Sequence, residues 1–222
     1  MREDEPLIEW EWVARNADQI LDRLIQHIGL TLIAVVAGFL ISFALALLIY
    51  RRRRLHGPLT GAAATLYTIP SIALFAALTP ITGFGSILTA EIALVSYTLL
   101  ILLRNIVSGL DSVPAEVREA ATAMGYSSWQ RMWRVDLPLA LPLIVAGVRV
   151  ATVTTVGLVT VAAIIGQGGL GQLILSGLRS FFTTPTYVGA FLSLGLALAF
   201  DVVLLGLQRR LTPWAAQKTA NA

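Results

Sequence analysis

The feature that most restricts the fold is an apolar run, Ile28 to Tyr50, that contains no charged side chain. As a helix this run would be ~34 Å long, enough to cross the ~30 Å hydrocarbon core of a bilayer. The composition agrees, since 56% of residues are hydrophobic, only 13% are charged, and the mean hydropathy is +0.77. The sequence therefore predicts a membrane protein and not a soluble domain.

Four further apolar runs have the length of a membrane crossing, so we expect an all-α polytopic membrane protein with five transmembrane helices. The expected spans are 28–50, 61–81, 86–103, 139–165 and 186–207, within a transmembrane domain of 28–210. Pro70 lies inside the second span and should kink it, because proline removes one hydrogen bond and clashes with the preceding turn. Residues 1–27 are acid-rich, with apolar side chains at helical spacing near their end, and predict a short amphipathic helix on the membrane surface. Residues 211–222 are expected to be a cytoplasmic tail.

Lysine and arginine residues predict the orientation. Arg51, Arg52, Arg53 and Arg54 follow the first span, and under alternating topology their side carries eleven basic residues against four on the other. By the positive-inside rule this side is cytoplasmic, which places the N-terminus outside and the C-terminus inside a bacterial-type inner membrane. The pI is near 9.7, but the basic residues sit at the ends of apolar runs, so no nucleic-acid partner is expected.

The longest polar connection, residues 111–138, contains a spaced pattern. It reads Glu119-Ala120-Ala121, then Gly125, and ends at Leu137-Pro138. Ser112 is expected to cap a first helix and Gly125 to end it in a left-handed conformation, while Ser127 and Gln130 have the spacing of a capping box. The pattern thus predicts two short helices at an angle before Pro138 opens the fourth span. An interfacial amphipathic loop without a partner is the alternative.

This pattern resembles the cytoplasmic EAA loop of importer-type ABC transporter permeases, Glu-Ala-Ala-x3-Gly-x9-Ile-x-Leu-Pro, with Val135 in place of the isoleucine. The resemblance implies a type I importer permease whose loop docks into an ATP-hydrolysing subunit. It implies two such ATPase subunits that bind ATP and Mg, a second permease chain, an extracytoplasmic substrate-binding protein, and no cofactor or catalysis in this chain. The implied coupling residues are Glu119, Ala120, Ala121, Gly125, Leu137 and Pro138.

Other short stretches are similar to the osmoprotectant branch of these permeases, which carries glycine betaine, choline or carnitine. They are Ile69-Pro70-Ser71, Arg104-Asn105, Gly109-Leu110 and the Gly-Gly-Leu-Gly stretch at 168–171. Methionine-importer permeases share the five-span plan and a similar glycine-rich stretch, so a methionine or other amino-acid importer remains an alternative. A self-contained secondary carrier or channel is an alternative of another class, although the sequence shows no inverted repeat of the kind that carriers often have.

Three ionisable residues, Glu91, Arg149 and Asp201, lie inside the expected spans. Charge at that depth must be paired or hydrated, so these residues either line the translocation path or form a structural pair, and both possibilities stay open. Pro70 and a re-entrant turn that contains Gly168 and Gly169 are further candidates for the path. No metal site is expected, since the chain has no cysteine and its two histidines are far apart in the sequence.

Overall fold

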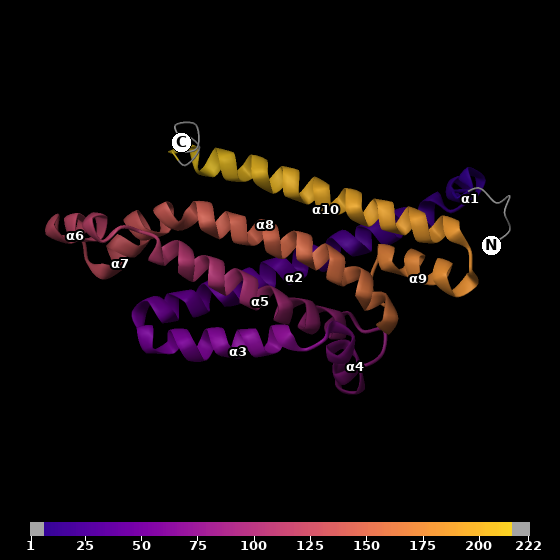
Figure 1. Ribbon diagram of the computed structural model, residues 1–222, viewed down its shortest axis with the longest axis horizontal. Helices are drawn as coiled ribbons and strands as arrows, with labels where there is room; N and C mark the ends of the chain where they lie inside the picture. Colours follow the sequence, from indigo (N-terminus) through magenta and orange to yellow (C-terminus); the bar gives the residue numbers. More distant parts are fainter. Residues whose placement is uncertain (1–6, 215–222) are drawn as a thin grey trace.

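The computed structural model describes residues 7–214, and every regular element within that range is a helix (Figure 1). The α-helices are α1 (Trp10–Arg15), α2 (Ala17–Arg51), α3 (His56–Thr68), α4 (Ser71–Thr82), α5 (Ile87–Asp111), α6 (Ala115–Ala123), α7 (Ser128–Arg131), α8 (Leu137–Val161), α9 (Leu170–Ser180) and α10 (Thr183–Leu211). Two 3₁₀ turns, η1 (Arg53–Leu55) and η3 (Ala162–Ile165), and one π-helical turn, η2 (Met132–Asp136), connect them.

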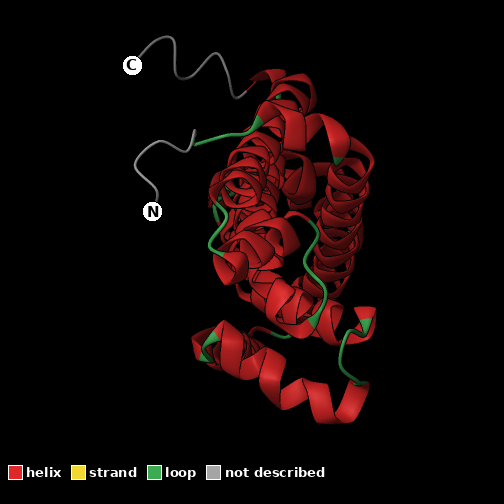
Figure 2. Ribbon diagram, turned by 90° about the vertical axis from the view of Figure 1, so that its right-hand side faces the viewer, coloured by secondary structure: helices red, strands yellow, loops and turns green. Residues whose placement is uncertain are grey.

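Four continuous helices are long and apolar enough to cross a membrane: Ala17–Arg51, Ile87–Asp111, Ser128–Ile165 and Thr183–Leu211. The pair Arg53–Thr68 and Ser71–Thr82 also qualifies when taken together, and counting it as one crossing gives five. The all-α membrane architecture expected from the sequence is therefore confirmed. Seen from one end, the long helices lie alongside each other and the loops join them at their ends (Figure 2).

The second span differs from the kinked helix that the sequence predicts, because it is broken at Pro70 and its two halves meet at 94°. Ile69 takes an extended backbone conformation, which is what a following proline favours. Its carbonyl, freed from the helix, accepts a hydrogen bond from the Tyr97 hydroxyl of α5. This tertiary partner satisfies the open backbone group and allows a break in place of a kink.

The N-terminal segment also differs from the expectation of a separate surface helix. The amphipathic residues are the first turns of α2, which continues without interruption from Ala17 to Arg51, so the expected boundary at 27/28 falls inside one helix. Within residues 7–214 the short α1 precedes it, and its Trp12 ring packs edge-on against Phe182 at the start of α10. Residues 1–6, together with residues 215–222 of the expected tail, lie outside the described range.

The core is built around α5, which lies between α2 and α8. One buried cluster includes Ile49, Leu102 and Ile106, and a second includes Ala34 and Leu94. Glycine allows the helices to approach closely. A methyl group on Gly38 of α2 would collide with Thr98 of α5, and one on Gly147 of α8 would collide with Asn105 of α5.

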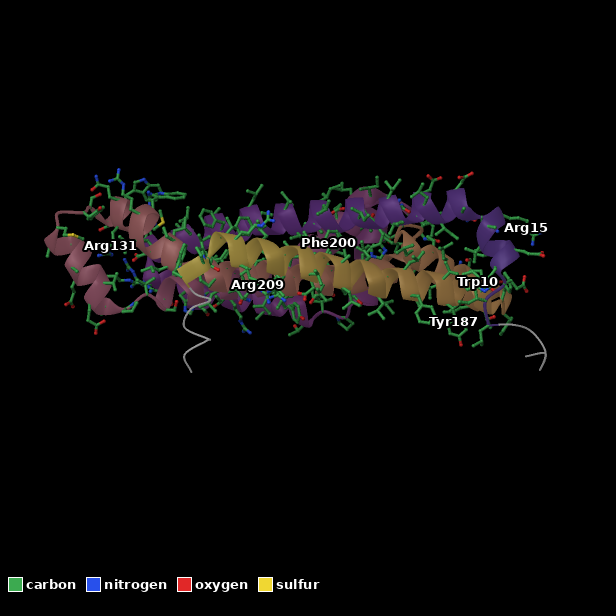
Figure 3. The ribbon with its side chains drawn as sticks, turned by 90° about the horizontal axis from the view of Figure 1, so that it is seen from above. Trp10, Arg15, Arg131, Tyr187, Phe200 and Arg209 are labelled. Carbon is green, nitrogen blue, oxygen red and sulfur yellow. The ribbon has the colours of Figure 1, made fainter. Side chains whose placement is uncertain are left out.

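The two ends of the bundle carry different segments. The connection between α2 and α3, the loop with α6 and α7, and the end of α10 lie at one end, whereas α1 and α9 lie at the other (Figure 1). Figure 3 shows Arg131 and Arg209 at the first end and Trp10 and Tyr187 at the opposite end. The predicted cytoplasmic loops are thus gathered at one end, together with the Arg51–Arg54 run.

The packing of α2 on α5 can be tested by adding one methyl group. Gly38→Ala should destabilise the protein by about 1–3 kcal/mol, because the new Cβ overlaps the side chain of Thr98. Gly29→Ala in the same helix is the matched control, since a Cβ there has no neighbour within 4 Å. Alanine has the higher helix propensity, so the control should be neutral or up to about 1 kcal/mol more stable. Thermal unfolding in detergent measures both, and equal shifts would contradict the packing described here.

Candidate functional site

The loop between α5 and α8 begins differently from the prediction that Ser112 caps its first helix. Ser112 closes α5 instead, because its amide donates to Ser108 O (2.9 Å) and its hydroxyl donates to Gly109 O (2.7 Å). The carbonyls at the end of α5 need donors, and the serine satisfies two of them. The helix α6 starts after Pro114, whose carbonyl accepts the amide of Arg118 at 3.3 Å.

Gly125 ends α6 as the sequence predicts. Its φ is 85°, in the left-handed region that glycine adopts at low cost. The amide of Gly125 donates to Thr122 O (2.9 Å) and the amide of Tyr126 donates to Ala121 O (3.1 Å). This pair of bonds is a Schellman motif, which fixes the direction in which the chain leaves α6.

The predicted capping box at the start of α7 is present, and it opens the longest helical stretch of the loop. The Ser127 hydroxyl accepts the Gln130 amide at 3.3 Å, and the Gln130 side chain accepts the Ser127 amide at 2.9 Å. The expected second short helix is, however, continuous with the span, since α7 runs through the π-helical turn η2 into α8. Pro138 lies in the first turn of α8, where the π-helical hydrogen-bond pattern before it accommodates the missing amide hydrogen.

The implied coupling residues divide into an exposed and a buried group. Glu119, Ala120 and Gly125 are exposed on the loop, whereas Ala121 is 2% exposed and packs inside the chain. Leu137 and Pro138 are half-buried at the start of α8. Beside Glu119 lies a hollow of about 310 Å³, lined by Arg118, Glu119, Thr122, Ala123 and Arg131. The face of α6 that another protein can reach is therefore built from Glu119, Ala120 and this hollow.

A cluster that the sequence reasoning missed lies beneath the loop. Asp136 is fully buried, and its carboxylate accepts a hydrogen bond from the Tyr50 hydroxyl at 2.6 Å. Arg118 and Arg131 approach the same carboxylate, with Nε to oxygen distances of 3.5 and 3.7 Å. The sequence signal was a single acidic residue directly before Leu137-Pro138 in an otherwise basic stretch.

Two of the three charged residues in the spans are brought together. Arg149 of α8 donates to Asp201 of α10 from Nε (3.0 Å) and from Nη2 to both carboxylate oxygens (2.8 and 3.0 Å). Its remaining nitrogen donates to Gln208 at 3.2 Å. The pair borders a cavity of about 510 Å³ between α8 and α10, lined by Ala146, Arg149, Val150, Val153, Thr154, Leu194, Ala197, Leu198 and Asp201.

The other residues suggested for the path do not line this cavity. Glu91 lies on α5 at 9% exposure, and neither carboxylate oxygen has a hydrogen-bond partner in the described part of the chain. Pro70 lies at the break between α3 and α4. Gly168 and Gly169 have φ of 122° and 51° and are buried, with the backbone of Gly169 packed so closely on α2 that a Cβ would lie 2.6 Å from the Cβ of His27. Within residues 7–214, no group of three His, Asp or Glu side chains is placed to hold a metal ion.

The chain is similar to known membrane transport proteins over most of its length. A family described as "Binding-protein-dependent transport system inner membrane component" matches residues 21–213. The osmoprotectant import permease protein OsmW of Salmonella typhimurium is 40% identical over 202 residues, which cover 89% of this chain and 94% of OsmW. The choline transport system permease protein OpuBB of Bacillus subtilis is 34% identical over 210 residues, covering 94% of this chain and 95% of OpuBB.

A solved structure agrees in fold. An inward-facing form of the MetNI methionine ABC transporter matches with a TM-score of 0.78 at 24% identity, covering 87% of this chain and 97% of that chain. The likeness at that identity concerns the fold alone. The family match and the two relatives cover nearly all of the helical bundle, and so the chain belongs to the family of inner membrane components of binding-protein-dependent transport systems.

Proposed function

We propose that this chain is the permease subunit of an ATP-driven importer for osmoprotectants such as glycine betaine, choline or carnitine. The observation that carries the proposal is the 40% identity to OsmW, an osmoprotectant import permease, over 89% of this chain. The loop geometry supports it, since α6 is an exposed helix whose direction is fixed by Gly125 and whose reachable face includes Glu119. The chain hydrolyses nothing itself, because ATP and Mg are bound by a partner ATPase subunit.

We propose that two such ATPase subunits bind the end of the bundle that carries α6 and α7. This end also carries Arg51–Arg54, Arg209 and Arg210, and the positive-inside rule assigns it to the cytoplasm of a bacterial-type inner membrane. A second permease chain, identical or homologous, completes the path across the membrane. A substrate-binding protein delivers the substrate at the opposite end, where α1 and α9 lie.

Arg149 and Asp201 are proposed to line the translocation path. Their side chains are 23% and 36% exposed, which is unusual for an ion pair in the middle of an apolar bundle, and they face a cavity. Ionisable groups at that depth are retained where water or substrate reaches them. The same pair also joins α8 to α10, so a purely structural role is the alternative that an experiment must separate.

Gly125 is the sharpest test of the coupling loop. Gly125→Val should lower ATP-dependent uptake and the amount of ATPase subunit that copurifies, because a β-branched residue at a φ of 85° costs about 1–3 kcal/mol. A Cβ there has no neighbour within 4 Å, so the effect arises from the backbone and from the added bulk on the docking surface. Gly125→Asn is the control, since asparagine tolerates the left-handed conformation and should retain most of the activity. Normal assembly and uptake in Gly125→Val would refute the proposed coupling role.

The role of the ion pair can be separated from its contribution to stability. Arg149→Met should destabilise the protein by about 1–3 kcal/mol, a value reduced from that of a fully buried pair because both side chains are partly exposed. The double variant Arg149→Met/Asp201→Leu should recover stability, since no unpaired charge is left. If the pair lines the path, uptake by the double variant remains low although its melting temperature is restored. Recovery of uptake together with stability would show that the pair only joins the two helices.

The substrate class is tested with the complete importer in liposomes. ATPase activity should rise when the binding protein is loaded with glycine betaine, choline or carnitine, and should stay at the basal rate with methionine. We place this selectivity in the binding protein, which is expected to hold the quaternary ammonium group in an aromatic cage. Uptake that needs neither ATP nor the binding protein, driven by an ion gradient alone, would exclude an importer of this kind.

A further inference from the structure

The buried carboxylate of Asp136 lies among side chains from α2, α6 and α7. Tyr50 in the last turn of α2 donates to it, and Arg118 of α6 and Arg131 of α7 lie on its other sides. Arg131 also donates from Nη2 to the Tyr50 hydroxyl at 3.3 Å. The tyrosine thus hydrogen-bonds both the aspartate and Arg131, while the Nε atoms of Arg118 and Arg131 lie 3.5 and 3.7 Å from the carboxylate, as ion pairs without a hydrogen bond.

A carboxylate buried at this site is stable only because of these partners. Asp136 is 0% exposed, and moving an unpaired charge out of water costs several kcal/mol. Two guanidinium groups, each on a side chain about a quarter exposed, balance that charge. The π-helical turn Met132–Asp136 ends at this residue, and such turns are frequent at functional sites.

Aromatic contacts hold the same loop to α2 on its apolar side. Trp133 of η2 packs against Phe43 of α2 with ring centroids 6.1 Å apart, and Trp129 of α7 packs edge-on against Trp133 at 5.5 Å. The guanidinium of Arg51 at the end of α2 lies 4.8 Å above the Trp129 ring. The loop is therefore attached to the first span by a polar contact at Asp136 and an apolar contact at Trp133.

The helix α6 itself makes few contacts with the bundle. Its main neighbours are α7 and η2, and among the spans its clearest side-chain contact is the bond from Arg118 to the Leu110 carbonyl at the end of α5. A displacement of α6 therefore passes to α5 through Arg118 and the short connection before Ala115, and to the rest of the loop through α7 and η2. From there it continues directly along the helix into α8, and it reaches α2 through Asp136 and the aromatic contacts.

We infer that Asp136 is a positioning residue, which locks the orientation of α6 and α7 relative to the end of α2 through Tyr50, Arg118 and Arg131. A movement imposed on α6 by the ATPase subunit is then delivered to the first span and to α8 together. The inference rests on the proposed function, because it concerns how the proposed coupling loop drives the spans.

A ligand site at the same place is less well supported. A hollow of about 360 Å³ is lined by Tyr50, Arg51, Arg53, Arg118, Ser128 and Arg131. Its arginines already have partners inside the chain, namely the Trp129 ring for Arg51, Asp111 for Arg53, the Leu110 carbonyl for Arg118, and the hydroxyls of Tyr50 and Thr122 for Arg131. The contacts therefore indicate a mechanical connection and not an anion site.

The test changes single side-chain groups in the contact between Tyr50 and Asp136, in the reconstituted importer. Tyr50→Phe deletes only the hydroxyl, and Asp136→Asn removes the charge at nearly constant volume. Substrate transported per ATP hydrolysed should fall by about five-fold in each, since coupling residues of this kind change coupling by 0.5–2 kcal/mol. The double variant should be no worse than the more affected single variant, because both changes act on the same contact between Tyr50 and Asp136. Tyr67→Phe on α3, whose ring packs against Tyr97, is the matched control and should couple like the unaltered protein.

A second measurement reports the distance between α6 and the end of the first span. The chain contains no cysteine, so Arg54→Cys and Ala123→Cys introduce two unique spin-label sites, one in η1 directly after α2 and one on α6. The label-to-label distance distribution should be narrow with Asp136 present and should broaden in Asp136→Asn, with partial recovery in Asp136→Glu.

The outcomes separate the inference from the proposed function. If assembly and melting temperature fall but transport per ATP in the assembled complex and the distance distribution are unchanged, Asp136 only stabilises the fold and the inference is wrong. If the unaltered importer itself shows no ATP-dependent uptake, the proposed function fails first. Normal coupling in the unaltered protein together with normal coupling in Tyr50→Phe and Asp136→Asn overturns the inference alone.

Discussion

The packing of α5 between α2 and α8 is the contact on which the rest of the structure depends. In a bilayer the hydrophobic effect does not draw helices together, because the lipid tails are as apolar as the helix surfaces. The helices associate through close packing instead, which small residues allow. Gly38 and Gly147 supply that closeness on the two sides of α5, and Gly109 of α5 lies against Ala140 at the start of α8. Because these three helices are fixed, the ends of α2, α5 and α8 meet at one end of the bundle, where the loop with α6 and α7 is built.

The loop between α5 and α8 has an exposed face on α6 and a base, formed by α7 and η2, that packs on α2. Glu119 and Ala120 are exposed, while Ala121 in the next position is buried and anchors the same short helix. The carboxylate of Asp136 and the rings of Trp129 and Trp133 hold the base to α2. A helix of nine residues is too short to be stable alone in water, so the shape of α6 depends on the Schellman motif at Gly125 and on these tertiary contacts.

The sequence predicted the features that depend on local chemistry and missed those that depend on a distant partner. The five apolar runs, the left-handed Gly125 and the capping box at Ser127 follow from residues close in the chain. The sharp break before Pro70 needed Tyr97, which is 28 positions from its partner Ile69, and Asp136 needed Tyr50, which is 86 positions away. The pairing of Arg149 with Asp201 was left open for the same reason, because spacing along a chain does not say which helices are neighbours.

The last helix contributes little to the interior. Only 6% of the apolar 18-residue stretch of α10 is buried inside the bundle. Neither of the two buried clusters includes a residue of α10. The helices that form those clusters all precede α10 in the order of synthesis, so the core can assemble before the C-terminal part of the chain has left the ribosome. During biogenesis α10 would then be added to a bundle that is already formed, docking against α8 and α9 as a final step.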